Sequence, residues 1–350
     1  MDIEKKIFSM KRVLMIAYHF PPIQGSSGVH RTVQFARHLP SFGWAPIIVA
    51  PHPRAYPAIG DESWAKLPEE AVVKRAFAMD SARHLSIRGR YFGLTAIPDR
   101  WVSWLPGGVY ECMRLIRKYK PDVIWSTFPI ATAHLIGLTV QRLTGLPWVA
   151  DFRDPMIQEG QTASRINRKL HQQLEKEIVR RSSCCTLVTR SALDNYRQRY
   201  PDKNPADWRL IENGYDESLF APYDHLYDDN KQRPDNRPLK ILHSGRLYSL
   251  GRNSLPFLEA VKSLINKSKV NIEVVFRGCG SEAEIGEYIH RLQLADVVKL
   301  LPSISYDSAI KEMIQSDVLA VFQGSVYNNQ IPAKIYEYIR AGRPILALTD

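Results

Sequence analysis

The sequence predicts an α/β protein built from two Rossmann-like domains, each a parallel sheet covered by helices. Three observations lead to this prediction. Short apolar segments of strand length alternate with amphipathic segments of helical period along most of the chain. One polar stretch, residues 221–238, is rich in Asp, Asn and Pro and is typical of a linker. A length of 350 residues suits two domain cores better than one.

The first domain is predicted over residues 1–220. Its alternation is clear except in residues 51–106, which are irregular and rich in Pro, Trp and Arg. The predicted strands are residues 13–18, 46–50, 122–127, 148–152, 184–188 and 208–212. The predicted helices are residues 28–39, 110–119, 131–144, 163–181 and 192–199.

The second domain is predicted over residues 239–350, where the same alternation restarts after the linker. The predicted strands are residues 239–243, 272–276, 297–301, 318–322 and 344–348. The predicted helices are residues 254–265, 282–292, 307–315 and 333–340. The sequence stops at Asp350 directly after a strand, so we expect this domain to be incomplete at its C-terminus.

The net charge of +11 favours anionic partners such as phosphates, nucleic acid or an acidic membrane surface. Positive charge is densest in residues 165–203. This stretch has helical period and matching acidic residues, among them Glu175 and Glu177, which favours a solvated helix face. The alternative is a surface that holds the protein against anionic lipid headgroups.

A second segment allows the same two interpretations. Trp101, Val102, Trp104 and Leu105 follow Arg100 and could rest on a membrane. The alternative is a set of aromatic side chains packed under a loop.

The compartment is predicted from what the sequence lacks. The longest apolar runs are strand-sized, and the N-terminal segment does not resemble a secretory signal. The four cysteines have no spacing typical of a disulfide framework or a zinc site, so we interpret them as buried thiols. We predict a cytoplasmic protein, with attachment to the inner face of the membrane left open.

Ligands of open α/β sheets bind at the carboxyl ends of the strands, so the residues that follow each strand are candidates. His19 follows the first predicted strand, and a loop with Gly25 and Gly28 leads into the first helix. The glycines allow backbone amides to approach a ligand, and the helix N-terminus favours an anion. A plain turn is the alternative.

The corresponding loops of the second domain combine glycine with arginine. Gly245, Arg246 and Arg252 follow its first strand, and Arg277 and Gly278 follow its second. Close backbone amides and fixed positive charge are what a diphosphate requires. Loop glycines with surface arginines are the alternative.

The most specific segment is residues 330–344. Lys334 and Glu337 lie three residues apart at the start of a predicted helix and share one face. Lys334 there would meet phosphate, and Glu337 would accept hydrogen bonds from ribose hydroxyls. Gly342 ends the helix and Pro344 opens the next strand. A surface ion pair is the alternative.

Residues 330–344 resemble the donor-binding motif of retaining glycosyltransferases of family four (glycosyl transferase group 1), which have the GT-B fold. Glu337, Gly342 and Pro344 match the second half of that motif. The first Glu of the motif falls on Asn329, which the resemblance places beside the transferred sugar. The Pro-x-Lys that ends at Lys334 is similar to a subgroup that builds bacterial surface polysaccharides.

Other segments extend the resemblance along almost the whole chain. Residues 25–28 with Arg31 are similar to the family's first loop, and residues 151–155 to an Asp-x-Arg-Asp segment of the same subgroup. Residues 213–216 resemble the family's Asn-Gly-x-Asp signature. Residues 245–247 resemble the start of the family's Gly-Arg-Leu…Lys phosphate clamp.

Two family positions differ. The Lys of the phosphate clamp falls on Gly251, where the neighbouring Arg252 could substitute. A His often found after the fourth strand is replaced by Ser126 and Thr127.

The resemblance implies two domains facing each other across a cleft and a nucleotide diphosphate-sugar as donor. It implies transfer with retention to a hydroxyl of a sugar or lipid-linked sugar, with no required metal or other cofactor. The leaving phosphate would take the acceptor's proton, while His19, Asp151 and Asp154 orient the acceptor. Asp151 has a structural alternative, in which it pairs with Arg153 or caps a helix.

Three rival functions remain. A nucleotide-sugar epimerase of GT-B fold would share the architecture, but acid and base groups around its donor are not evident. A non-catalytic nucleotide-sugar-binding protein is suggested by Asn329 and Gly251. A nucleic-acid-binding protein is suggested by charge alone, and no recognition motif supports it, so we predict no nucleic-acid partner.

Overall fold

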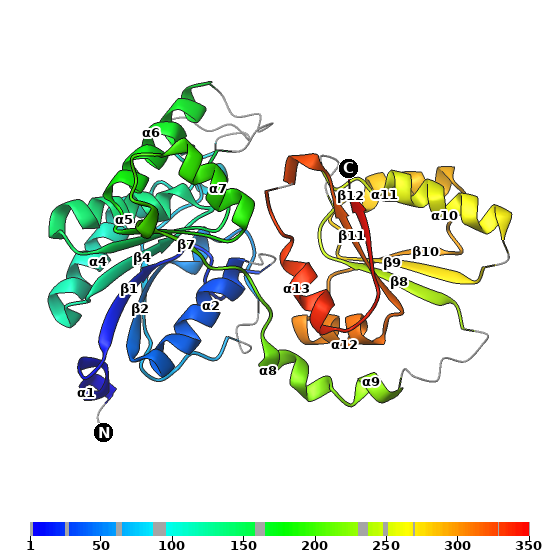
Figure 1. Ribbon diagram of the computed structural model, residues 1–350, viewed down its shortest axis with the longest axis horizontal. Helices are drawn as coiled ribbons and strands as arrows, with labels where there is room; N and C mark the ends of the chain where they lie inside the picture. Colours follow the sequence, from blue (N-terminus) through cyan, green and yellow to red (C-terminus); the bar gives the residue numbers. More distant parts are fainter. Residues whose placement is uncertain are drawn as a thin grey trace. The chain divides into compact units, whose positions relative to one another are not determined.

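The computed structural model describes residues 3–24, 28–60, 65–86, 96–157, 165–229, 237–247, 251–268, 270–327 and 329–349. The chain divides into two compact units, Met1–Glu212 and Asn213–Asp350. Each unit contains one parallel sheet with helices packed against it (Figure 1). The predicted two-domain α/β fold is therefore confirmed.

The N-terminal unit is built on a seven-stranded sheet with the order β3-β2-β1-β4-β5-β6-β7. Its strands are β1 (Lys11–Ile16), β2 (Trp44–Pro51), β3 (Val72–Ala76), β4 (Val123–Thr127), β5 (Trp148–Phe152), β6 (Cys184–Leu187) and β7 (Trp208–Leu210). Its helices are α1 (Ile3–Phe8), α2 (Gly28–His38), α3 (Ser81–His84), α4 (Trp104–Tyr119), α5 (Ala131–Thr144), α6 (Arg165–Arg181) and α7 (Arg190–Arg199).

The central strands of this sheet are buried on both faces. Trp125 and Ser126 are consecutive in β4, so their side chains point to opposite faces. Trp125 meets Phe35 of α2, with ring centroids 5.5 Å apart, while Ser126 bonds to His134 of α5. Helices α2 and α5 therefore cover opposite faces (Figure 1). This sandwiching explains why the strands read as continuous apolar runs in the sequence.

Strand β3 lies in the region predicted to be irregular, so that prediction was wrong for Val72–Ala76. β3 is an edge strand that pairs only with β2. Lys74 and Arg75 interrupt its apolar pattern. An edge strand tolerates charged residues because one of its sides is open to solvent. The same charged residues interrupt the apolar run that is typical of a strand in the sequence.

The C-terminal unit is built on a five-stranded sheet with the order β10-β9-β8-β11-β12. Its strands are β8 (Leu239–Ser244), β9 (Ile272–Arg277), β10 (Val298–Leu301), β11 (Val318–Gln323) and β12 (Ile345–Thr349). Its helices are α8 (Glu217–Phe220), α9 (Leu226–Asp229), α10 (Leu255–Lys267), α11 (Glu282–Arg291), α12 (Tyr306–Gln315) and α13 (Ala333–Arg340).

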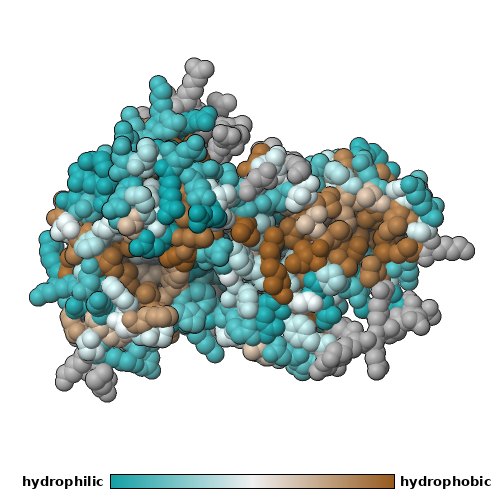
Figure 2. All heavy atoms as spheres, viewed as in Figure 1, coloured by the Kyte–Doolittle hydropathy of each residue, from teal (hydrophilic) through white to brown (hydrophobic). Residues whose placement is uncertain are grey.

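Two apolar clusters form on opposite faces of this sheet. Consecutive residues of β8 divide between them, with Ile241 in the cluster under α10 and α11 and Leu242 in the cluster under α12 and α13. Figure 1 shows these helix pairs on either side of the sheet. The edge strand β12 exposes Ile345 and Leu346, and Figure 2 shows apolar surface on the visible face of this unit.

The unit boundary, between Glu212 and Asn213, precedes the predicted linker of residues 221–238. Phe220 is completely buried in the second unit's core. Arg340 of α13 makes ion pairs with Glu217 and Asp224, which fastens this segment to the second unit. Asp224 of the predicted linker is thus an ion-pair partner within this unit, while residues 230–236 lie outside the described residues.

The basic segment of residues 165–203 forms α6 and α7, whose charges are partly paired. Arg180 and Arg142 both bind Glu177 on the surface. Glu175 is not on a solvated face, because it is fully buried and accepts hydrogen bonds from Tyr196, Tyr200 and Arg199.

The segment around Trp104 packs inside the unit. Trp104 is fully buried, and the Trp101 indole donates to the Ala55 carbonyl over 3.0 Å. The packed alternative holds for these two side chains. Among the helices that the structure describes, none combines the length and the apolar character that a membrane span requires.

Gly137 of α5 provides a test of the N-terminal core. A Cβ there would lie 2.9 Å from the Ser126 hydroxyl and 3.0 Å from the Trp148 indole, both fully buried. We expect Gly137→Ala to lower the free energy of unfolding by about 1–3 kcal/mol, although alanine is the better helix former. Tryptophan fluorescence in urea reports on this unit, because all 7 tryptophans precede residue 213.

The matched control is Gly286→Ala in α11, where the added Cβ has its nearest neighbour at 3.9 Å. This variant should stabilise its own unit by about 0.5–1 kcal/mol and leave the fluorescence transition unchanged. An unchanged transition in Gly137→Ala would contradict the packing around Ser126.

Candidate functional site

In the N-terminal unit, the order of strands reverses at β1 and β4, and His19 follows β1. Its ring is partly buried and stands edge-on to Tyr18, with centroids 5.1 Å apart. Burial, together with the positive charge of Arg153, lowers the pKa of His19 to about 3. His19 is therefore uncharged at neutral pH and can donate one hydrogen bond and accept another.

Arg153 is the centre around which three predicted site residues gather. Its guanidinium lies on the first residue of α2, because a Cβ at Gly28 would stand 2.0 Å from Nη1. Asp154 approaches the same guanidinium at 3.5 Å, and the positive charge of Arg153 acts on His19. A side chain at position 28 would therefore displace this guanidinium. The other predicted glycine, Gly25, lies outside the described residues.

Asp151 has a different environment from Asp154. It is fully buried, and Thr127, Asp151 and Thr186 lie in register across β4, β5 and β6. Both hydroxyls donate to the carboxylate, at 2.7 and 2.6 Å. Arg31 of α2 binds both carboxylate oxygens, at 3.0 and 2.8 Å. The partner of Asp151 is therefore Arg31, and not Arg153 or a helix end.

The Asp151 carboxylate is charged in spite of its burial. Burial alone would raise its pKa, but Arg31 and the hydroxyls of Thr127 and Thr186 hold the pKa below its usual value. This network accounts for Thr127 at the position of the family's His. Ser126 belongs to a separate buried chain, in which it accepts from Trp148 and contacts His134.

In the C-terminal unit, hydrogen bonds join the loops that follow β8 and β9. The amide of Gly245 donates to the Arg277 carbonyl at 2.9 Å, and that of Leu247 to the Cys279 carbonyl at 2.8 Å. Gly245 has φ +115° and Gly278 has φ +59°, which are conformations that L side chains rarely adopt. The two predicted glycine loops are therefore hydrogen-bonded to each other at the carboxyl ends of β8 and β9.

Lys334, in the first turn of α13, lies against this paired loop. A Cβ at Gly245 would stand 3.1 Å from its Nζ. The amine lies 3.2 Å from Nε2 of His243, the penultimate residue of β8. Burial, and then the charge of Arg252, lower the pKa of Lys334 to about 7, while Glu337 opposes the shift.

Glu337 lies one turn further along α13. Its Oε1 accepts a hydrogen bond of 2.5 Å from the Tyr306 hydroxyl at the start of α12. Burial raises its pKa, although Tyr306 and Lys334 act in the opposite direction. Lys334 and Glu337 are thus partly buried within the unit, so the surface ion-pair alternative does not describe them.

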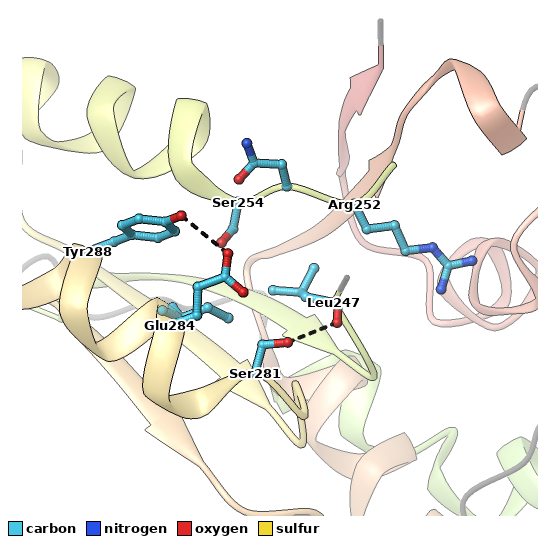
Figure 3. Close-up of a pocket in the computed structure, with 8 residues that line it drawn as sticks. Leu247, Arg252, Ser254, Ser281, Glu284 and Tyr288 are labelled. Carbon is cyan, nitrogen blue, oxygen red and sulfur yellow. Dashed lines mark hydrogen bonds between the residues drawn. The ribbon is translucent and has the colours of Figure 1, made fainter. Parts of the chain in front are cut away.

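The remaining predicted donor residues lie around Lys334. Arg246 is exposed, and its side-chain stem passes 3.7 Å from the Cβ position of Gly280. Arg252 stacks on Tyr327 at 5.2 Å and is one of the residues that line the small hollow in Figure 3. That hollow has a volume of about 10 Å³, room for one water molecule. Asn329 is exposed in the loop before α13.

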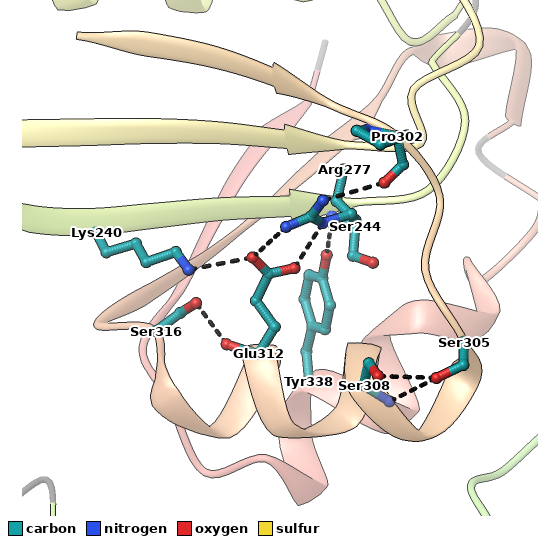
Figure 4. A network of polar contacts seen from close by, with 9 residues as sticks. All are labelled: Lys240, Ser244, Arg277, Pro302, Ser305, Ser308, Glu312, Ser316 and Tyr338. Carbon is teal, nitrogen blue, oxygen red and sulfur yellow. Dashed lines mark hydrogen bonds and ion pairs between the residues drawn. The ribbon is translucent and has the colours of Figure 1, made fainter.

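The loop pattern predicted that Arg277 would bind a diphosphate, but its guanidinium binds a carboxylate of the protein. Figure 4 shows its guanidinium on Glu312 of α12, with N–O distances of 2.8 and 2.9 Å. Lys240 reaches the same carboxylate at 3.1 Å. In the same view, the hydroxyl of Tyr338 accepts from the Ser244 amide at 3.0 Å. These contacts hold α12 and α13 against the ends of β8 and β9.

In the C-terminal unit, two contributors were not predicted as site residues. His243 is the last residue of the predicted strand 239–243 and was not named as a candidate, although a histidine at the end of an apolar strand is itself a signal. Tyr306 has no sequence signal, because its contact with Glu337 spans 31 positions. Among the described residues, no group of three His, Cys, Asp or Glu side chains could hold a metal ion.

The environment of Asp151 predicts a large effect on stability. We expect Asp151→Ala to lower the free energy of unfolding by about 3–5 kcal/mol, because it leaves the Arg31 charge buried without its partner. Asp154→Ala, at a more exposed ion pair, should cost less than about 1 kcal/mol. Tryptophan fluorescence during urea unfolding measures both.

The same network predicts an acid-sensitive unit. Since the folded pKa of Asp151 is depressed, its stabilisation is complete above the unfolded pKa and is lost as pH falls through the folded pKa. The Asp151→Ala variant should lose less stability over that range than the wild type. Equal losses in the two proteins would contradict the assignment.

Comparisons with known proteins agree with this architecture. Residues 27–214, more than half of the chain, match the family model described as Glycosyl transferase 4-like domain. No curated protein matches the chain in sequence.

Three solved structures show the same fold at low identity. The sucrose-phosphate synthase of Thermosynechococcus elongatus is 17% identical, with a TM-score of 0.69 over 96% of this chain and 81% of that one. Anabaena HepE in complex with UDP is 16% identical, with a TM-score of 0.63 over 97% and 80%. A UDP-N-acetylglucosamine 2-epimerase is 10% identical, with a TM-score of 0.54 over 98% and 79%. The chain has the two-domain GT-B fold and belongs to the glycosyl transferase 4-like family.

Proposed function

We propose that the protein transfers a sugar from a nucleotide diphosphate-sugar to a hydroxyl acceptor, with the donor bound by the C-terminal unit. One observation carries the proposal. Lys334 and Glu337 lie at the start of α13, beside the Gly245 turn, where the strand order reverses between β8 and β11. Such reversal points are where open α/β sheets bind ligands. The family match supports the same class of reaction.

The diphosphate would bind beside the basic side chains of this site. Lys334, Arg252 and the exposed Arg246 supply positive charge, and the Gly245 turn allows the backbone to approach closely. As the sugar leaves, negative charge develops on the diphosphate. Fixed cations at that position stabilise the transition state more than the ground state, so no metal ion is needed in the proposal.

Glu337 would bind the ribose. Tyr306 occupies its Oε1, which fixes the carboxylate and leaves Oε2 as an acceptor for a sugar hydroxyl. Asn329, in the loop before α13, would contact the transferred sugar. An amide in place of a carboxylate can donate as well as accept hydrogen bonds, so it would select a different pattern of sugar hydroxyls.

The acceptor would be oriented by the N-terminal unit. Uncharged His19 and the Asp154 carboxylate offer hydrogen-bond acceptors, and Arg153 pairs with Asp154 near the N-terminus of α2. In a retaining front-face reaction, the leaving phosphate takes the acceptor's proton, so no separate base is required. Asp151 would contribute indirectly, by fixing Arg31 and α2.

UDP is the nucleotide that we propose first. HepE was solved with UDP and with UDP-glucose, and MnaA of S. aureus with UDP. A hydroxyl of a sugar or lipid-linked sugar, in surface polysaccharide or glycoconjugate synthesis at the cytoplasmic face of a membrane, is the acceptor that completes the proposal.

The donor site is tested by thermal stabilisation with UDP, GDP, ADP and dTDP and their sugars. A ligand at 100 times its Kd should stabilise the C-terminal unit by about 2.7 kcal/mol through mass action. We expect UDP compounds to act, and Arg246→Ala and Glu337→Ala to remove most of the effect. The matched controls are Arg291→Ala and Glu259→Ala, two exposed residues of the same unit.

The reaction is tested by incubation with UDP-sugars and acceptors, followed by NMR of the products. Release of UDP with an unchanged anomeric configuration is expected. An altered sugar still attached to the nucleotide would indicate the epimerase alternative. Binding without turnover would indicate a non-catalytic protein, and no stabilisation by any nucleotide would contradict the proposal.

A further inference from the structure

His243 is a polar side chain in an aromatic core. It is 1% exposed, and its ring lies 5.0 Å from that of Phe322 and 6.1 Å from that of Phe276. The two residues before it in β8, Ile241 and Leu242, are apolar core residues. A phenylalanine would fill the same space without the cost of burying two ring nitrogens, so packing alone does not account for the imidazole.

Hydrogen bonding determines the tautomer of His243. Its Nδ1 lies 2.8 Å from the Ala320 carbonyl of β11. A carbonyl oxygen can only accept, so Nδ1 carries the proton and Nε2 presents a lone pair. Burial, and then the charge of Lys334, hold the pKa of His243 well below its usual value, although hydrogen bonds to the backbone of Ala320 and Gly245 oppose the shift. The ring is therefore uncharged, and its acceptor faces the Lys334 amine at 3.2 Å.

Lys334 is surrounded by groups that oppose and support its charge. His243 faces it from β8 and Arg252 from the loop before α10, while Glu337 lies on its own helix with Tyr306 of α12 behind. Burial and Arg252 disfavour the ammonium form, which Glu337 favours, and the pKa of about 7 lets the amine gain or lose a proton near neutral pH.

We propose that His243 is a positioning residue for the donor diphosphate: its Nε2 holds the Lys334 amine over the Gly245 turn, and the amine takes up a proton from solvent as the diphosphate binds. The inference rests on the proposed function, because it assigns the diphosphate to this turn. A dianion beside Lys334 favours the ammonium form, and an amine already held in place loses less freedom when it is bound.

The sign of the pH dependence follows from this linkage. The Lys334 pKa is about 7 in the free protein and higher in the complex. Affinity for the diphosphate is therefore complete below pH 7 and falls above it, by up to about tenfold per pH unit until the pKa of the complex is reached.

The first experiment needs no ligand. The rate of acetylation of Lys334 is measured by peptide mass spectrometry from pH 6 to pH 10, in the wild type and in two variants. His243→Phe keeps the ring and removes the acceptor, whereas His243→Gln keeps an acceptor near the position of Nε2. We expect a lower apparent pKa of Lys334 in His243→Phe and a value near that of the wild type in His243→Gln.

The second experiment measures UDP binding calorimetrically in buffers of different ionisation enthalpy, which reports the protons taken up. After the ionisation of the UDP phosphate itself is subtracted, the wild type should show a net uptake of part of a proton at pH 7. His243→Phe should bind UDP on the order of tenfold more weakly, with its loss of affinity beginning at a lower pH, and His243→Gln should recover most of the affinity. Melting curves without ligand verify that each variant is folded.

The outcomes separate the inference from the proposed function. If the wild type binds no nucleotide, the proposed function fails, while acetylation still measures the contact between His243 and Lys334. If the wild type binds UDP and His243→Phe binds it with the same affinity and pH profile, the role of His243 is overturned alone. An unchanged apparent pKa of Lys334 in His243→Phe also overturns it.

Discussion

In both units, the positions of the functional groups depend on a reversal of strand order next to the first strand. β1 pairs with β2 on one side and β4 on the other, and β8 pairs with β9 and β11. Crossovers between parallel strands are right-handed. Helices that connect strands on one side of the first strand therefore cover one face of the sheet, and helices that connect strands on its other side cover the opposite face. The loops then diverge at the carboxyl ends, where His19 and His243 lie.

The buried polar groups divide into two kinds. The oxygens of Asp151 are occupied by Arg31 and two threonine hydroxyls, and Glu312 is bound by Arg277 and Lys240. Such satisfied networks fix the packing of a helix on a sheet. Among the described residues, the Lys334 amine contacts one polar side chain, His243, and the Glu337 carboxylate accepts from one, Tyr306. Both groups can therefore form further hydrogen bonds. That difference separates groups that hold the fold from groups suited to a ligand.

The ends of helices were predicted accurately where a neighbouring glycine or proline terminates the helix. Helix α5 was predicted to the residue, because Gly145 at φ +69° closes it, and α13 likewise, because it lies between Pro332 and Gly342. The same approach missed β3, an edge strand with charged residues. It also assigned residues 221–229 to a linker, because their polar side chains pair with Arg340, a partner far away in the sequence.

By itself, the sequence determined the α/β class, the two domains and the positions of the phosphate-binding candidates, because these depend on apolar period and on glycines at strand ends. The tertiary structure alone decided which polar residues meet. Asp151 meets Arg31 across 120 positions, and Lys334 meets His243 across 91. Such pairs follow from sheet order and register, which bring distant strands together and leave no periodic trace in the chain.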